Sequence, residues 1–541
     1  MNPSVRLTAF TVLLGGLIPV GIQAQAPNKA LDFAQTITAA DLEKHLRVLA
    51  ADDMQGRETG TPGQKRAAEY IAKQFTADGL KPIVPGTDGT LSYSQPFSLY
   101  RKTWGEFYVK VGDKKMVYGT DFTTNGLVSI PTETAYETVF VGYGISDAKY
   151  DDYANLDVKG KAVVILDGEP KMANGQSVVG GSADPSKWGL ADGLRAKTSL
   201  AKDKGAAQIL VISAESVEGY KQLLAQRSAM QGRFNRLSLK SGAENTGSVG
   251  VFLVSQEVGA MLLGTKAATF KKTVEQIGRT GKTTAGSLKG QMSVKAERKE
   301  EAVQTENVMG FIEGSDKKEE VVIISAHYDH IGVSADGQVN NGANDDGSGT
   351  VSVLEIAQAF QEAKNAGNGP RRSMLFLTVT GEEKGLLGSQ YYADMSPVLP
   401  LANTVCDLNI DMVGRVDDLH QGKADSTNYI YAIGSDKLSS DLHKISEATN
   451  QQYTQMSLDY KYNEPNDPER IYYRSDHYNF AKNRIPIIFY FNGLHSDYHK
   501  PGDDVEKINF KLAEKTARLV FLTAWDVVNR DQRLVVDSYK K

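Results

Sequence analysis

Short apolar runs alternate with segments of helical character over the C-terminal half of the chain, and this alternation limits the possible folds more than any other feature. The runs "VVIISA", "SMLFLTVTG", "VCDLNI" and "PIIFYFNG" each have the length of a buried strand. Buried strands that alternate with helices form a largely parallel sheet that helices cover on both faces. We therefore predict an α/β fold for residues 286–541, a mostly parallel mixed sheet flanked by helices.

The N-terminal half has a different pattern, which indicates a second domain. Residues 37–80 predict two amphipathic helices, and the alternating aromatic residues of 94–120 predict strands. From 126 to 285 the chain is rich in β-like runs such as "VKGKAVVILDGEP" and contains no histidine. We interpret 126–285 as an inserted β-rich domain, which divides the main domain into residues 25–125 and 286–541.

The first residues have the pattern of a signal peptide. Arg6 precedes about 15 mostly apolar residues, and small and polar residues follow. Cleavage after Ala24, which defines a signal peptide of residues 1–24, keeps Pro27 away from the cut. The apolar stretch is too short for a membrane span, and no other segment reaches some 18 uninterrupted apolar residues. We expect an exported protein, periplasmic or secreted, with no membrane anchor.

Charge and cysteine content exclude some partners and some kinds of site. A formal net charge of −5 over 541 residues gives no reason to expect a nucleic-acid partner. Cys406 is the only cysteine, so the chain has no internal disulfide and no cysteine-based zinc finger. Its apolar surroundings, "TVCDLNIDMVG", predict a buried structural thiol.

Acidic residues and histidines follow the predicted strands of the C-terminal half. His327 ends one strand, Glu382 and Glu383 follow the next, and Asp411 ends a third, while Asp345 and His499 lie in loops. Because open parallel sheets place their binding crevices at the carboxyl ends of the strands, we expect these side chains to converge. Converging carboxylates repel one another unless cations lie among them. Two histidines and three acids suit a pair of divalent ions, most commonly zinc.

The order of these motifs resembles a known family. "HYDH", "GANDDGSG", "GEEKGLLGS", "NIDMVG" and "DYHKPGDD", with "MQGRETGTPGQKRAAEYIAKQF" upstream, are similar to the exopeptidases that use a co-catalytic pair of zinc ions. That family includes bacterial leucyl-type aminopeptidases, glutamate carboxypeptidase and glutaminyl cyclase. The resemblance covers about residues 300–510 and implies the zinc exopeptidase fold. The insert, with "VGYGI" and "DVKGKAVVIL", is similar to the protease-associated domain that such enzymes often carry.

The resemblance implies a set of ligands for two zinc ions per chain. His327 and Asp411 would bind one ion. Glu383 and His499 would bind the other, and Asp345 would bridge both.

The resemblance also implies the catalytic residues. Glu382 matches the general base, which would accept the proton of a water shared by the two zinc ions. Asp329 matches the acid that orients the imidazole of His327. Asp503 has a similar position relative to His499.

Several neighbouring residues are interpreted as structural or stay open. We expect His330 to pack or to form hydrogen bonds, Asp346 to shape its loop, and His499 rather than His495 to be the ligand. No role is predicted for His477. Tyr472, Tyr473 and Arg474 are candidates for an oxyanion donor, and the sequence does not identify that donor.

These observations favour an exported zinc aminopeptidase that removes N-terminal residues from peptides with a free N-terminus. The alternatives on the same fold are a glutamate-type carboxypeptidase and a glutaminyl cyclase, the latter expected to hold one zinc ion. A receptor-like protein without catalysis is a third hypothesis, although such relatives would be expected to lack ligands or the base. The preferred terminal residue, the oligomeric state and the role of the insert do not follow from the sequence.

Overall fold

The computed structural model describes residues 29–126, 128–233, 237–240 and 249–538. The predicted signal peptide, residues 1–24, therefore lies outside the described residues. By their contacts, the described residues form two compact units. The first contains the chain up to Gln95, Asn307–Val379 and the chain from Tyr392 onward, and the second contains Pro96–Glu306 and Thr380–Tyr391.

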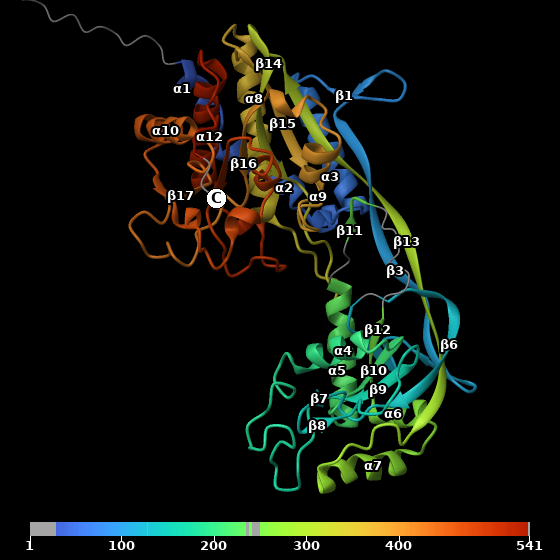
Figure 1. Cartoon of the computed structure of the whole chain (residues 1–541). Coiled ribbons are helices and arrows are strands. Elements are labelled where there is room, and N and C mark those ends of the chain that lie inside the picture. The colour runs from blue at the N-terminus through green and yellow to red at the C-terminus, as the bar shows by residue number, and fades with distance from the viewer. Residues whose placement is uncertain (1–28, 127, 234–236, 241–248, 539–541) are drawn as a thin grey trace, which may run out of the picture. The chain divides into compact units, whose positions relative to one another are not determined.

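The sheet of the first unit is mixed and mostly parallel. Its strands are ordered β18-β17-β19-β16-β14-β15-β13, and β14 lies parallel to both of its neighbours (Figure 1). Two antiparallel pairs, β13 with β15 and β17 with β19, make the sheet mixed. The strands are β13 (Lys289–Ile312), β14 (Lys317–His327), β15 (Arg372–Val379), β16 (Thr404–Ile410), β17 (Tyr429–Ile433), β18 (Ser457–Asp459) and β19 (Ile487–Phe491).

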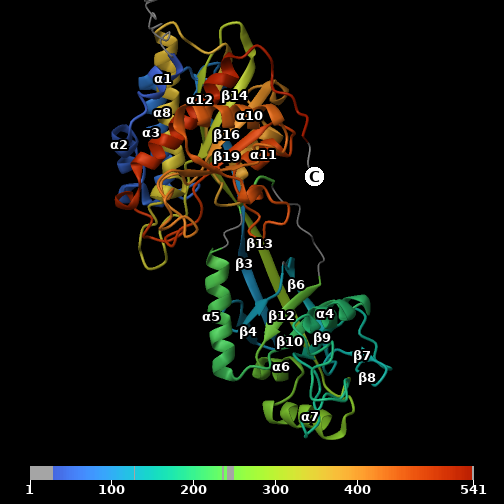
Figure 2. The ribbon, with the colours of Figure 1, turned by 90° about the vertical axis from the view of Figure 1, so that its left-hand side faces the viewer.

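Helices cover both faces of this sheet. Successive residues of a strand point to opposite sides, and in β14 both sets of side chains are apolar and pack against other elements. Ile324 of β14 packs in one apolar cluster with Phe360 and Phe521, whereas the adjacent Ile323 packs in another with Phe480. Figure 2 shows α8 and α3 on one side of the central strands and α11 on the other. The predicted α/β architecture is therefore confirmed at this level. The helices of the unit are α1 (Lys29–Ala34), α2 (Ala39–Leu49), α3 (Pro62–Asp78), α8 (Gly349–Asn365), α10 (Ser440–Thr449), α11 (His477–Ala481) and α12 (Phe510–Asn529).

The two predicted N-terminal helices have clear start and stop signals. Thr38 accepts a hydrogen bond from the N–H of Asp41 and so caps α2, and Thr61 caps α3 through the N–H of Gln64. Pro62 occupies the first turn of α3, and Gly79 ends the helix in the left-handed conformation. Local capping chemistry therefore explains why these boundaries were readable from the sequence.

The second unit contains a sheet of its own. The N-terminal part of β13 pairs with β6, and the order continues β9-β10-β12-β5, with β9, β10 and β12 parallel. The strands are β3 (Ser94–Val111), β4 (Lys114–Val117), β5 (Phe122–Thr124), β6 (Ile130–Phe140), β9 (Ala162–Leu166), β10 (Gln208–Ile212), β11 (Leu237–Ser238) and β12 (Gly250–Val254). Two short pairs complete the described strands: β1 (Val84–Pro85) with β2 (Leu91–Ser92), and β7 (Ser146–Asp147) with β8 (Tyr150–Asp151).

This unit has more helix than the sequence indicated. The helix α7 (Ala267–Thr280) lies in a tract that is rich in Gly, Lys and Thr. Phe270, Val274 and Ile277 form its apolar stripe, at a helical spacing that the polar residues between them obscure. The other helices here are α4 (Gly193–Asp203), α5 (Val217–Arg233), α6 (Gln256–Leu262) and, in the 380–391 segment, α9 (Leu387–Gln390).

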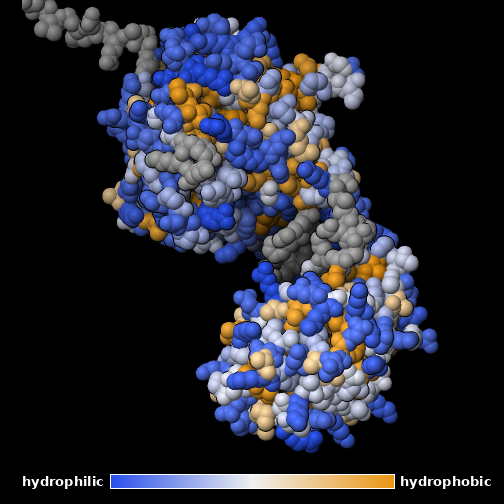
Figure 3. Space-filling model, in the orientation of Figure 1, coloured by the Kyte–Doolittle hydropathy of each residue, from blue (hydrophilic) through white to orange (hydrophobic). Residues whose placement is uncertain are grey.

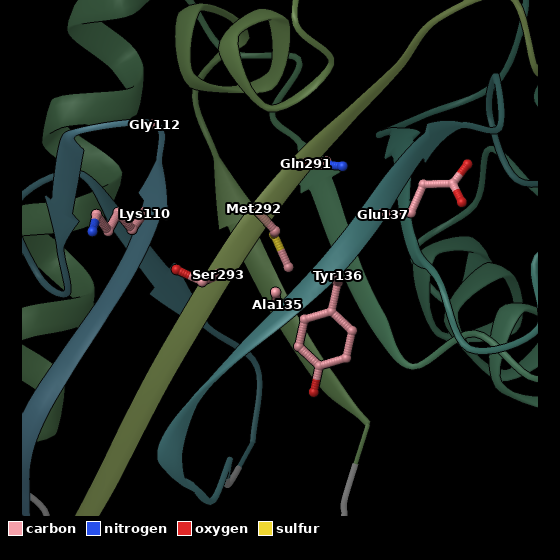
Figure 4. Close-up of a pocket in the computed structure, with 8 residues that line it drawn as sticks. All are labelled: Lys110, Gly112, Ala135, Tyr136, Glu137, Gln291, Met292 and Ser293. Carbon is pink, nitrogen blue, oxygen red and sulfur yellow. The ribbon is translucent and has the colours of Figure 1, made fainter.

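One pocket of the second unit, of about 340 Å³, lies on strands β3, β6 and β13. Figure 4 shows its lining side chains, among which Lys110 and Glu137 point to opposite sides. Because its polar groups do not converge and include no histidine or cysteine, this pocket is not a candidate catalytic site.

The surface agrees with the absence of a long apolar segment. The face of the first unit seen in Figure 3 is mostly hydrophilic, with hydrophobic side chains interspersed. Among the described residues, no helix is long and apolar enough to cross a membrane.

Cys406 is fully buried in β16, as predicted, and burial raises the pKa of its thiol. We expect the native protein not to react with a thiol reagent until it unfolds. Cys406→Ser should lower the free energy of unfolding by about 1–3 kcal/mol, because it buries a hydroxyl in an apolar core. Denaturant titration measures this loss, with Cys406→Ala as the control for lost volume. Rapid labelling of the folded protein would contradict the burial.

Candidate metal centre

β14 ends at the first candidate ligand, His327, and its neighbours hold this residue in place. The side chain is 1% exposed, and Thr350 of α8 donates a hydrogen bond to the backbone carbonyl at 2.7 Å. Nδ1 lies 3.1 Å from the carbonyl oxygen of Asp329 and 3.8 Å from its carboxylate. With the Nδ1 proton donated to that carbonyl, Nε2 carries the lone pair through which the imidazole can bind a metal.

Asp345 lies between two imidazoles. One carboxylate oxygen, Oδ1, is 3.4 Å from Nε2 of His327, and the other, Oδ2, is 3.1 Å from Nε2 of His499. Although burial alone would raise it, these two imidazoles hold the pKa of Asp345 well below its usual range. A buried carboxylate with a different histidine at each oxygen has the arrangement of a bridging ligand.

Asp411 follows β16 and completes the group around His327. Its Oδ1 lies 3.6 Å from Nε2 of His327, and Ser475 donates a hydrogen bond to its Oδ2 at 2.7 Å. Oδ1 is buried and accepts no hydrogen bond from the described residues. A buried carboxylate oxygen without a donor is costly, so this atom fits a cation.

Glu382 and Glu383 follow β15 in the 380–391 segment, which belongs to the second unit, so their roles as base and ligand stay predictions. Within the first unit, His330 also lies near the candidate ligands, with Nδ1 3.8 Å from Oδ2 of Asp345, although we expected a packing role for it. Imidazole nitrogens and carboxylate oxygens at such separations suit zinc, so the residues fit the metal that the sequence indicated.

Asp346 acts as a brace between the elements that carry the ligands. Its carboxylate accepts hydrogen bonds from the N–H groups of Gly349 at 2.8 Å, Met412 at 3.0 Å and His327 at 3.3 Å. These contacts join the ends of β14 and β16 to the start of α8. They agree with the prediction that Asp346 shapes the loop, and burial raises the pKa of this carboxyl well above its usual range.

Asp503 supports the backbone of the bridging residue. Its carboxylate accepts the N–H groups of Asn344 and Asp345, at 3.1 and 3.0 Å. Burial raises its pKa to about 6. The resemblance implies that Asp503 also orients His499, and this role stays a prediction.

Arg57 is a structural residue that the sequence reasoning missed. Its buried guanidinium donates hydrogen bonds to the carbonyls of Tyr328, Asn341, Gly342 and Leu49. The first three carbonyls flank His327 and Asp345, so one cation ties together the segments that carry both ligands. The available signal was its place in the "MQGRETG" motif, within the segment that carries the resemblance.

The remaining histidines near the site have structural surroundings. His477 is fully buried, and its Nε2 lies 2.8 Å from the carbonyl oxygen of Tyr472. Burial lowers the pKa of His477 to about 3 and that of His495 to about 4. Both imidazoles are therefore neutral near pH 7, and His495 lies 3.9 Å from Asp503.

Comparison with known proteins identifies the segment that carries the site. The profile of peptidase family M28 matches residues 307–524, which confirms the family resemblance that the motifs indicate. The chain is 23% identical over 244 residues to aminopeptidase YwaD of Bacillus subtilis, covering 42% of this chain and 46% of the relative. It is 26% identical over 228 residues to leucine aminopeptidase 2 of Trichophyton equinum, covering 38% and 41%. The chain thus spans less than half the length of these curated relatives.

Two solved structures also align with this chain. An aminopeptidase from Aneurinibacillus sp. strain AM-1 gives a TM-score of 0.47 at 18% identity, covering 94% of this chain and 98% of that one. The zinc aminopeptidase BSAP from Bacillus subtilis gives 0.44 at 18% identity, covering 93% and 99%.

The hydrogen bonds of Asp346 predict that its removal lowers both stability and zinc content. Asp346→Ala should leave three buried N–H groups without an acceptor, at ~1–3 kcal/mol each, and should lower zinc content by displacing His327. Denaturant unfolding and metal analysis measure the two effects. Asp336→Ala, in the exposed part of the same loop, is the control. If both variants had the same free energy of unfolding and the same zinc content, the role of Asp346 would be wrong.

His477 predicts loss of stability in acid. Burial lowers the pKa of His477 in the folded protein to about 3, below the ordinary histidine value of 6.5, so the unfolded chain binds a proton more readily. The contribution is complete above about pH 6.5 and decreases by ~1.4 kcal/mol per pH unit as the pH falls toward 3. Between about pH 7.5 and pH 5, His477→Gln should therefore lose about 2 kcal/mol less stability than the parent. Urea unfolding at each pH measures the two stabilities. If the free energy of unfolding changed equally with pH in both proteins, this assignment would be wrong.

Proposed function

Because residues 307–524 belong to peptidase family M28, we propose that this protein is an exported zinc aminopeptidase that hydrolyses peptides at a free N-terminus. The observation that carries the proposal is the Asp345 carboxylate, which faces His327 with one oxygen and His499 with the other. Relatives named aminopeptidases support the direction of cleavage. The activity and substrates of the whole protein are part of this proposal.

Two zinc ions are proposed, held by residues from different parts of the chain. His327 and Asp411 would hold one ion, Glu383 and His499 the other, and Asp345 both. Bound zinc supplies Lewis-acid chemistry, which polarises a carbonyl and lowers the pKa of water. Asp411 Oδ1, buried without a donor among the described residues, supports such a role.

The protein's own groups would handle the proton. In the proposed reaction Glu382 accepts a proton from the attacking water as the new C–O bond forms. It then returns that proton to the nitrogen of the leaving amine as the C–N bond breaks. Asp329 holds His327 in orientation through its carbonyl, and Thr59 donates a hydrogen bond to the Asp329 carboxylate at 2.7 Å.

The other parts of the proposal concern export and the second unit. Residues 1–24 would direct export and be removed, and the insert of 126–285 would be a protease-associated domain. The parallel strands β9, β10 and β12 in that segment support a separately folded insert. The proposed protein has no membrane anchor and no nucleic-acid partner.

Glu382→Gln is the test of the mechanism. It should reduce kcat for a free-amine peptide by about 10²–10⁴-fold, the usual contribution of a general base, while metal analysis still finds two zinc ions per chain. His327→Ala is the control that should lose metal as well as activity. Loss of zinc in Glu382→Gln would mean that Glu382 is a ligand rather than the base.

A matched set of peptides separates the alternative functions. An aminopeptidase cleaves peptides with a blocked C-terminus and a free amine, a glutamate-type carboxypeptidase cleaves those with a blocked amine, and a cyclase closes N-terminal glutamine. A single zinc ion per chain would favour the cyclase. Complete inactivity of the zinc-loaded protein on all three substrates would favour a binding protein.

A further inference from the structure

Arg474 is an exposed arginine of the first unit to which the described residues offer no carboxylate. Nη2 of its side chain donates a hydrogen bond to the hydroxyl of Tyr498 at 3.2 Å. Six other arginines of the unit form ion pairs within 4 Å, as Arg415 does with Asp497 at 2.9 Å. The further pairs are Arg47–Glu43, Arg371–Asp316, Arg372–Glu320, Arg518–Glu514 and Arg530–Asp526.

Tyr498 connects this guanidinium to the candidate metal centre. Cζ of Arg474 lies 6.0 Å from the centroid of the Tyr498 ring. The same ring stacks on His499, with centroids 3.8 Å apart and planes at 23°. Arg474 therefore lies one aromatic ring away from an imidazole that contacts the bridging Asp345.

The position is open to a substrate. The side chain of His499 is 37% exposed, whereas those of His327 and Asp345 are 1% and 4% exposed. Of these three residues, His499 is thus the one that solvent reaches, and it is also the one on which the Tyr498 ring stacks. A peptide that reached the metal centre past His499 would pass near Tyr498 and Arg474.

The chemistry of the group points to a carboxylate. Guanidinium presents a planar set of donors that binds carboxylates through two hydrogen bonds, and it stays charged at every physiological pH. The acids nearest to Tyr498 in the chain are already engaged, since Asp497 pairs with Arg415 and Lys507. Asp503 is buried and accepts backbone N–H groups.

We propose that Arg474 is a specificity-determining residue that binds a carboxylate of the substrate. This inference rests on the proposed aminopeptidase function and adds the substrate class, short or N-terminally acidic peptides. The carboxylate has two sources, the side chain of an N-terminal Asp or Glu and the free C-terminus of a short peptide. Both present the same group to the arginine.

Three dipeptides distinguish these sources in the zinc-loaded, full-length protein. Leu-Gly-amide carries no carboxylate, Glu-Gly-amide carries one on the N-terminal side chain, and Leu-Gly carries one at the C-terminus. Arg474→Gln should lower kcat/KM for one of the two acidic substrates by roughly 10- to 100-fold, mainly through KM, the size expected for a hydrogen bond to a charged group. The value for Leu-Gly-amide should change by no more than about twofold.

Two further variants isolate the role of the guanidinium. Arg474→Lys keeps the charge without the planar donors, so it should recover part of the lost kcat/KM. Arg470→Gln is the matched control, because Arg470 belongs to the same loop but lies over Tyr473, with Cζ 4.9 Å from that ring. It should leave all three substrates unchanged.

Each outcome decides the proposal. A selective loss for Glu-Gly-amide assigns the N-terminal side chain, and a selective loss for Leu-Gly assigns the C-terminus. Equal losses on all three dipeptides, or no loss on any, overturn the role of Arg474 while the aminopeptidase activity stands. If the parent protein hydrolyses none of the three, the proposed function fails and the inference fails with it.

Discussion

Burial of several carboxylates side by side is the constraint on which the rest of this structure depends. Asp345, Asp346 and Asp411 are each at most 6% exposed, and each has a carboxylate oxygen within 3.6 Å of a nitrogen of buried His327. Like charges in such surroundings repel and lose their hydration, so each needs a compensating contact. Zinc at this position would supply the largest one, and the elements around it are arranged so that the ligands keep their places.

The compensation comes from backbone and from one buried cation as much as from the histidines. Asp346 and Asp503 accept N–H groups from segments far apart in the chain, and Arg57 donates to carbonyls that flank two of the ligands. Since each contact also joins two elements, the same bonds that lower the cost of burial position the site. The proposed hydrolysis requires such fixed geometry, because the general base must lie within hydrogen-bond reach of the water.

The exposed rim of the site follows a different rule. Around the buried ligands nearly every charge has a partner, whereas Arg474 is exposed and has the Tyr498 hydroxyl but no carboxylate as a partner among the described residues. A charged group without an internal counter-charge costs little at a surface, and it remains available to a charged ligand. The inner part of the site is therefore suited to hold metal, and the rim to select the substrate.

The architecture and most of the candidate site were readable from the sequence because both follow local rules. Strand periodicity, the caps at Thr38 and Thr61, and polar residues placed directly after apolar runs are short-range signals. Parallel strands then bring residues such as His327 and Asp411 to the same edge of the sheet, so their proximity followed from topology.

What only the tertiary structure decided are contacts between residues with no fixed spacing. The hydrogen bond from Arg57 to Tyr328 joins positions 271 residues apart, and Ser475 reaches Asp411 across 64 residues. The proximity of His330 to Asp345 depends on how one loop folds over another. Such contacts leave no periodic trace in the chain, because they arise from packing between elements rather than from the conformation of any one of them.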